Sequence, residues 1–150
     1  MAISKSLRDK LTVKTFIHAI RTDSLSILKP HIESLKFNES DYQKALTLSA
    51  FWNRPTSLKF LSNLDWDFLD KDSALNAAAA AGRITAISTL DQAGADIHTE
   101  EEFPLYIAAN RLHQGTTSYL LLKEPDFTHV EYALKTVFKR GNKQFALDCL

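Results

Sequence analysis

Residues 73–98, SALNAAAAAGRITAISTLDQAGADIH, contain the pattern that decides the fold of this chain. Gly82 interrupts the stretch, and glycine is the residue that most readily takes the left-handed conformation that ends a helix. After it, Ile84, Ile87 and Leu90 recur at steps of three, which is a helical spacing. The stretch therefore predicts a helix, a tight turn and a second helix.

The same pattern repeats along the chain every 29 or 30 residues. One row of apolar residues has this spacing: Phe16, Leu46, Leu75, Leu105 and Leu134. A second row falls at the expected turns: Asp23, Asn53, Gly82, Leu112 and Gly141. Glycine, asparagine and aspartate tolerate a left-handed turn, so Leu112 is the exception. We expect the turn of that unit to be shifted toward the nearby Gly115.

Five units follow from this spacing, at about 11–40, 41–70, 71–99, 100–129 and 130–150, and they form one domain over residues 1–150. Each unit is expected to hold an inner helix, a turn, an outer helix and a connecting loop. A single unit cannot bury its apolar face alone, so the units must stack. Cys149 is in register with Leu61, Leu90 and Leu120, which predicts a buried structural thiol.

The quoted stretch resembles an ankyrin repeat, whose pattern opens with T-P-L-H-x-A-A, turns at a glycine and closes with G-A-D-V-N. Residues 94–98, GADIH, resemble that close, and residues 103–109, FPLYIAA, resemble the opening. The resemblance implies an all-α fold, an ankyrin-type α-solenoid of about five stacked helix-turn-helix repeats. The family repeat is about 33 residues long, so the shorter period here predicts shortened fingers between the units. No unit has the full T-P-L-H sequence, so its hydrogen bonds are not carried over.

The last unit is expected to act as a C-terminal cap, because it stops inside its outer helix at Leu150. Terminal repeats need a polar outer face. The charged side chains of this unit would supply it: Lys139, Arg140, Lys143 and Asp148.

The resemblance also implies that the chain binds another protein on a concave face built by the inner helices and loops. In the family, the two residues before each turn face that groove. Here these pairs are Arg21-Thr22, Phe51-Trp52, Ala80-Ala81, Asn110-Arg111 and Lys139-Arg140. Phe51 and Trp52 are either binding anchors or side chains that fill a gap in their own unit. Arg111, Lys139 and Arg140 form either a basic end of the groove or a solvated face.

The connecting loops offer a second candidate surface. Glu100, Glu101 and Glu102 form an acidic tip that either contacts a partner or is simply solvated. Phe68 is in register with Ile97 and Phe127, which predicts a core position for Phe68. Trp66 lies where the next unit has only an alanine, so both a core and a binding role stay open.

Composition narrows the class of function. Eighteen basic residues balance eighteen acidic ones, so nucleic-acid binding is not expected, although Lys135, Lys139, Arg140 and Lys143 cluster near the end. The histidines are scattered and no catalytic, phosphate-binding or metal-binding motif occurs, so we expect no enzyme, no cofactor and no metal. A single cysteine and the lack of a signal-like or membrane-spanning segment predict a cytoplasmic protein, including the cytosol of a host cell.

These observations predict a non-catalytic adaptor or inhibitor that binds a partner protein. The alternative is a pathogen- or virus-encoded effector that inhibits an enzyme as a counter-defence. A less favoured alternative is self-association into a homodimer through apolar residues left uncovered at the end of the stack: Phe145, Leu147 and Leu150.

Overall fold

The computed structural model describes residues 12–35 and 37–149, and within these ranges every regular element is helical. The elements form five consecutive helix pairs. In chain order the pairs are α2 (Val13–Arg21) with η1 (Leu25–Ser34), α3 (Glu39–Phe51) with α4 (Pro55–Ser62), α5 (Lys71–Ala80) with α6 (Ile84–Gln92), α7 (Thr99–Asn110) with α8 (Gln114–Leu121), and α9 (Phe127–Lys139) with α10 (Lys143–Asp148).

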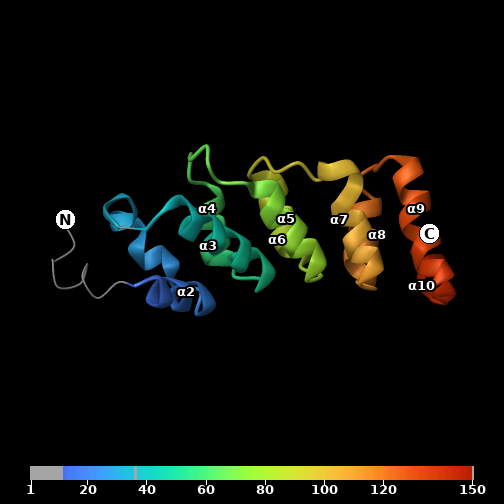
Figure 1. Ribbon diagram of the computed structural model, residues 1–150, viewed down its shortest axis with the longest axis horizontal. Helices are drawn as coiled ribbons and strands as arrows, with labels where there is room; N and C mark the ends of the chain where they lie inside the picture. The colour runs from blue at the N-terminus through green and yellow to red at the C-terminus, as the bar shows by residue number, and fades with distance from the viewer. Residues whose placement is uncertain (1–11, 36, 150) are drawn as a thin grey trace.

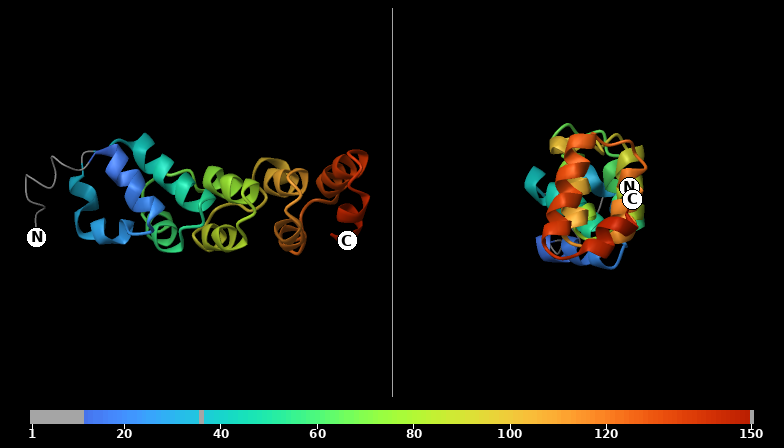
Figure 2. Two further views of the ribbon diagram at one scale, coloured as in Figure 1. Left: turned by 90° about the horizontal axis from the view of Figure 1, so that it is seen from below. Right: turned by 90° about the vertical axis from the view of Figure 1, so that its right-hand side faces the viewer.

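The helix pairs stand side by side in an elongated row (Figure 1). Seen from below, the first helix of each pair lies in one layer and the second in another (Figure 2). We call these layers the inner row (α2, α3, α5, α7, α9) and the outer row (η1, α4, α6, α8, α10). Each inner helix packs against the next inner helix and against its own outer partner. The fold is therefore a linear stack in which helix pairs contact their neighbours.

The turn between the two helices of a pair has the same form in all five pairs. The predicted row is left-handed throughout, with φ of 56° at Asp23, 53° at Asn53, 71° at Gly82, 62° at Leu112 and 87° at Gly141. Two backbone hydrogen bonds close each turn, as in the Schellman motif. In the central pair they run from the N–H of Gly82 to the carbonyl of Ala79 (3.1 Å) and from that of Arg83 to Ala78 (2.9 Å).

The prediction of a shifted turn near Gly115 is wrong. Leu112 itself takes the left-handed conformation, and Gly115 lies inside α8. The N–H groups of Leu112 and His113 close the turn on Ala109 and Ala108, both at 2.9 Å. The repeated packing of the helices therefore outweighs the cost of a left-handed leucine, about 1–2 kcal/mol.

The repeat register also defines the core. Phe16, Leu46, Leu75 and Leu105 are at most 1% exposed. Leu61, Leu90, Leu120 and Cys149, another register row, are buried as well. Burial raises the pKa of the Cys149 thiol, because the apolar surroundings disfavour the thiolate.

Three local features differ from the predicted pattern. The second element of the first pair is a 3-10 helix that contains Pro30, whose ring and missing N–H oppose an α-helix at that point. Glu100, Glu101 and Glu102 form no simple loop tip: all three have left-handed φ, at 49°, 56° and 68°, where the chain enters the regular part of α7. The last pair exposes the charged side chains expected of a cap, but it exposes large apolar side chains as well: Phe127 is 77% and Leu147 is 60% exposed. Its register equivalents Phe68 and Ile97 are half-buried and buried, whereas no later helix pair covers Phe127 in the described residues.

Candidate functional site

The ends of the inner helices hold the first group of predicted binding residues. Phe51 is 40% exposed at the last residue of α3. Trp52 is half-buried and packs against the core, and the guanidinium carbon of Arg21 lies 5.3 Å from the centre of its ring. Phe51 is thus available to a partner, whereas Trp52 already contacts the first helix pair.

Cationic side chains cover the carbonyl ends of the inner helices. The carbonyl of Ala80 accepts from Arg111 (3.4 Å) and lies 3.0 Å from Nε2 of His113. Arg140 donates to the backbone carbonyl of Asn110 (3.0 Å) and to its side-chain oxygen. Positive charge at a helix C-terminus is favourable. Arg111, Asn110 and Arg140 therefore join neighbouring helix pairs, while Lys139 is exposed beside them.

Trp66 lies in an aromatic cluster at the loop between the second and third helix pairs. Its ring is edge-on to Tyr42, with centroids 4.9 Å apart, and stacks on Phe68 at 5.4 Å. Trp66 and Phe68 are both half-buried against the core. The cluster thus accounts for Trp66 as a packing residue.

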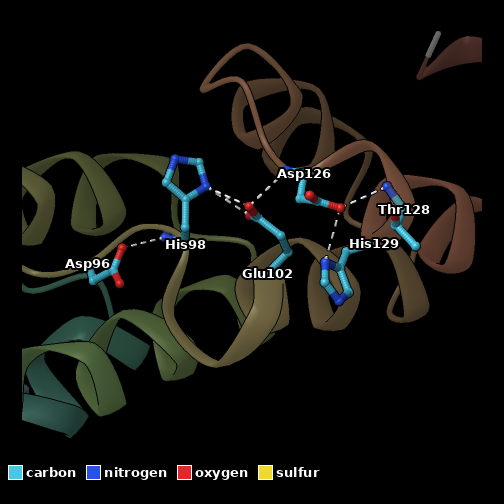
Figure 3. Close-up of polar contacts among 6 residues, drawn as sticks. All are labelled: Asp96, His98, Glu102, Asp126, Thr128 and His129. Carbon is cyan, nitrogen blue, oxygen red and sulfur yellow. Dashed lines mark hydrogen bonds and ion pairs between the residues drawn. The ribbon is translucent and has the colours of Figure 1, made fainter.

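The three carboxylates of the acidic turn at 100–102 differ in exposure and in the groups that they contact. Glu102 is 6% exposed, and both its oxygens lie within 2.9 Å of Nδ1 of His98. It also accepts the backbone N–H of Asp126 at 3.1 Å, so it connects α7 with the loop that leads to α9 (Figure 3). Glu101 is 86% exposed and lies 3.7 Å from Nε2 of His129. A run of three like charges therefore contains one structural and one freely accessible carboxylate.

A hollow of about 190 Å³ opens beside this turn, between α7 and α9. We call it the acid–tyrosine pocket; its lining is Glu100, Glu101, Glu102, Phe103, Tyr106, His129 and Tyr132. The rings of Tyr106 and Tyr132 stack across the two helices, with centroids 5.8 Å apart, and Tyr132 is 62% exposed. Carboxylates next to exposed aromatic rings form a site suited to a cation.

Neither Tyr106 nor Tyr132 was predicted as a site residue. A signal was present for Tyr132 alone, because Phe103 and Tyr132 occupy the same repeat position, where the second and third units have Lys44 and Ser73. Two successive aromatic residues in one register row place two rings on neighbouring inner helices.

No protein-family model and no curated protein matches the chain. The function is therefore inferred from the surfaces themselves. Within residues 12–35 and 37–149, no cluster of three or more His, Cys, Asp or Glu side chains has an arrangement that would hold a metal ion. None of the helices described is long and apolar enough to cross a bilayer.

Proposed function

We propose that the chain is an ankyrin-type protein-binding module, a non-catalytic adaptor or inhibitor, that holds a cytoplasmic partner on its inner row. The acid–tyrosine pocket is the observation that carries this proposal. It lies on two neighbouring inner helices, it is open to solvent, and its polar atoms are not all used within the chain.

The pocket suits an arginine or lysine side chain of the partner. Glu101 offers a carboxylate that is 86% exposed, and Tyr132 offers a ring face beside it. A cation over an exposed tyrosine contributes about 0.5–1 kcal/mol, and about 2 kcal/mol once water is excluded. The rigid helices add to affinity, because little side-chain freedom is lost when two tyrosines bind.

Phe51 provides a second contact in this proposal. It is exposed on the same inner row, at the opposite end of its helix from the connecting loops. An exposed aromatic side chain on a helix end is a typical interface anchor. A partner that contacts both positions would lie along the inner row. The part of its surface that is bound there would no longer be accessible to other molecules.

The proposal is tested by capturing partners from cell lysate with the native chain and three variants. Tyr132→Ala with Glu101→Gln removes the pocket, Phe51→Ala removes the second contact, and Lys59→Ala on the outer helix α4 is the control. We expect the pocket variant to bind the captured partner about tenfold more weakly in a direct titration. When the basic side chain of the partner is replaced by glutamine, the native chain should bind it about tenfold more weakly, whereas the affinity of the pocket variant should hardly change.

Each other outcome has a definite meaning. Loss of binding only in Phe51→Ala would move the site to the helix ends. Equal binding by all four proteins would contradict an inner-row site. Turnover of the partner by the native chain would contradict a non-catalytic role.

A further inference from the structure

A row of hydrogen-bond acceptors on the inner helices fixes the loops that follow the second, third and fourth helix pairs. Gln43, Asp72 and Glu102 are in repeat register, at steps of 29 and 30. Each accepts a backbone N–H just before the next inner helix. The distance from the backbone nitrogen to the side-chain oxygen is 2.8 Å for Asp70 and Gln43, and 2.7 Å for Asp96 and Asp72. It is 3.1 Å for Asp126 and Glu102.

Glu131 on α9 is the next member of this row, 29 residues after Glu102. Within the described residues its carboxylate accepts no loop N–H and instead pairs with Lys135, one turn along the same helix, at 2.9 Å. Its side chain is 54% exposed, whereas that of Glu102 is 8% exposed. The surface that is covered in the earlier helix pairs is therefore open at α9.

Apolar side chains surround this pair of charges. A groove of about 470 Å³ runs along α9 and α10, and its lining is Phe127, Val130, Glu131, Leu134, Lys135, Phe138, Ala146 and Leu147. The register equivalents of Leu134, which are Leu75 and Leu105, are at most 1% exposed because the next helix pair covers them. The groove is thus the same kind of face that packs against a neighbouring pair elsewhere in the stack.

We propose that this groove binds the same groove of a second copy of the chain, in a twofold, end-to-end dimer. A twofold interface needs a face that is complementary to itself. The groove meets this need because it holds one acid and one base, one helical turn apart, among apolar groups. With the two α9 helices antiparallel, Glu131 lies opposite Lys135 of the partner subunit, and the apolar side chains exclude water around both pairs. The single acid and the single base of the groove cancel in net charge, so the groove has no net charge that would attract a strongly charged partner surface.

The proposal is independent of the acid–tyrosine pocket and is tested by sedimentation velocity of the purified chain over a range of concentrations. We expect a monomer–dimer equilibrium that is lost in Phe127→Glu/Leu147→Glu, because four carboxylates would then face one another across the twofold axis. The matched control is Ile27→Glu on η1, at the other end of the stack, where an isoleucine is 74% exposed. This variant should dimerise like the native chain.

Charge reversal tests the twofold pairing itself. Glu131→Lys alone and Lys135→Glu alone should each weaken the dimer about tenfold, because like charges then meet. The double reversal Glu131→Lys/Lys135→Glu should restore the native dimer constant. All of these side chains are exposed, so the melting temperature measured by circular dichroism at a concentration where every protein is monomeric should not change.

The proposal is overturned by a chain that stays monomeric at every concentration, or by a dimer that survives Phe127→Glu/Leu147→Glu. Open-ended polymers would mean head-to-tail contact and would also overturn it. A double reversal that fails to restore the dimer would exclude the antiparallel pairing of α9.

Discussion

Replacing Gly82 by alanine tests the contact between the turn of the central helix pair and the next pair. Gly82 has φ of +71°, and a Cβ atom there would lie 2.8 Å from Nδ1 and 2.9 Å from Cγ of His113. The ring of His113 is held in turn, with Nε2 3.0 Å from the carbonyl oxygen of Ala80. Alanine must therefore accept a left-handed backbone and also displace this ring.

The two costs can be estimated separately. A left-handed alanine costs about 1–2 kcal/mol relative to glycine, of which about 0.4–1 kcal/mol is regained from the stiffer unfolded chain. Losing the hydrogen bond of His113 adds about 0.5–1.5 kcal/mol. We expect Gly82→Ala to lower the free energy of unfolding by about 2 kcal/mol in total.

Gly94→Ala is the matched control, because Gly94 has φ of +93° in the same helix-pair unit and no atom within 4 Å of the added Cβ. It should cost about 1 kcal/mol, which is the backbone part alone. Urea unfolding followed by far-UV circular dichroism gives both values, provided that the slope m is unchanged. In the background of His113→Ala, the extra cost of Gly82→Ala should disappear. Equal losses for the two glycine variants in the native background would refute the steric argument.

Further predictions concern the other turns and the core. Leu112→Gly should raise the free energy of unfolding by about 0.5–1 kcal/mol, because it relieves a left-handed leucine that is 42% exposed, and an unchanged or lower melting temperature would contradict this. Leu75→Ala and Leu105→Ala should each cost about 2–5 kcal/mol in urea unfolding, and near-zero losses would refute the core assignment. Burial alone would raise the pKa of Asp23, but the N–H groups of Ser57 and Thr56, which donate to its carboxylate at 2.7 and 3.1 Å, leave the pKa below 3.8. The stability that Asp23 contributes is therefore present above that pH and lost as the pH falls through the folded-state pKa, so Asp23→Asn should flatten the acid limb of the stability–pH curve. An acid limb of unchanged steepness would contradict that role.

The repeat period was enough to place the helices and the turns. Residues at steps of 29 and 30 share one environment, so the buried rows and four of the five left-handed turns were predicted from spacing and residue type. Leu112 shows that residue type alone can mislead. Leucine disfavours a left-handed turn, which led to the prediction of a shifted turn, yet the turn lies at the position that the repeat spacing indicates. Packing of α7 and α8 fixed the turn more strongly than the local cost of leucine opposed it.

The candidate site was less predictable, because it depends on which side chains meet between helices. The acidic turn consists of three successive glutamates. Glu102 is buried against His98, whereas Glu101 is almost fully exposed. Tyr106 and Tyr132 are 26 residues apart, which is not a repeat step, so their stacking follows from the offset of α7 and α9 and not from register. Register alone also does not fix burial: Ile97 is buried under the next helix pair, whereas Phe127 in the same row is 77% exposed.

The hydrogen bonds at the turns give the stack a direction. In each bond an arginine of the later helix pair donates to a backbone carbonyl at the inner-helix end of the earlier pair. The bonds run from Arg83 to Phe51, from Arg111 to Ala80 and from Arg140 to Asn110. During synthesis on the ribosome, the ends of α3, α5 and α7 therefore lack these donors until the next pair has emerged. In the monomer, the same polarity makes the C-terminal pair the first to open, since no later donor in the described residues covers the end of α9. Amide exchange should accordingly be fastest there and slow toward the centre of the stack.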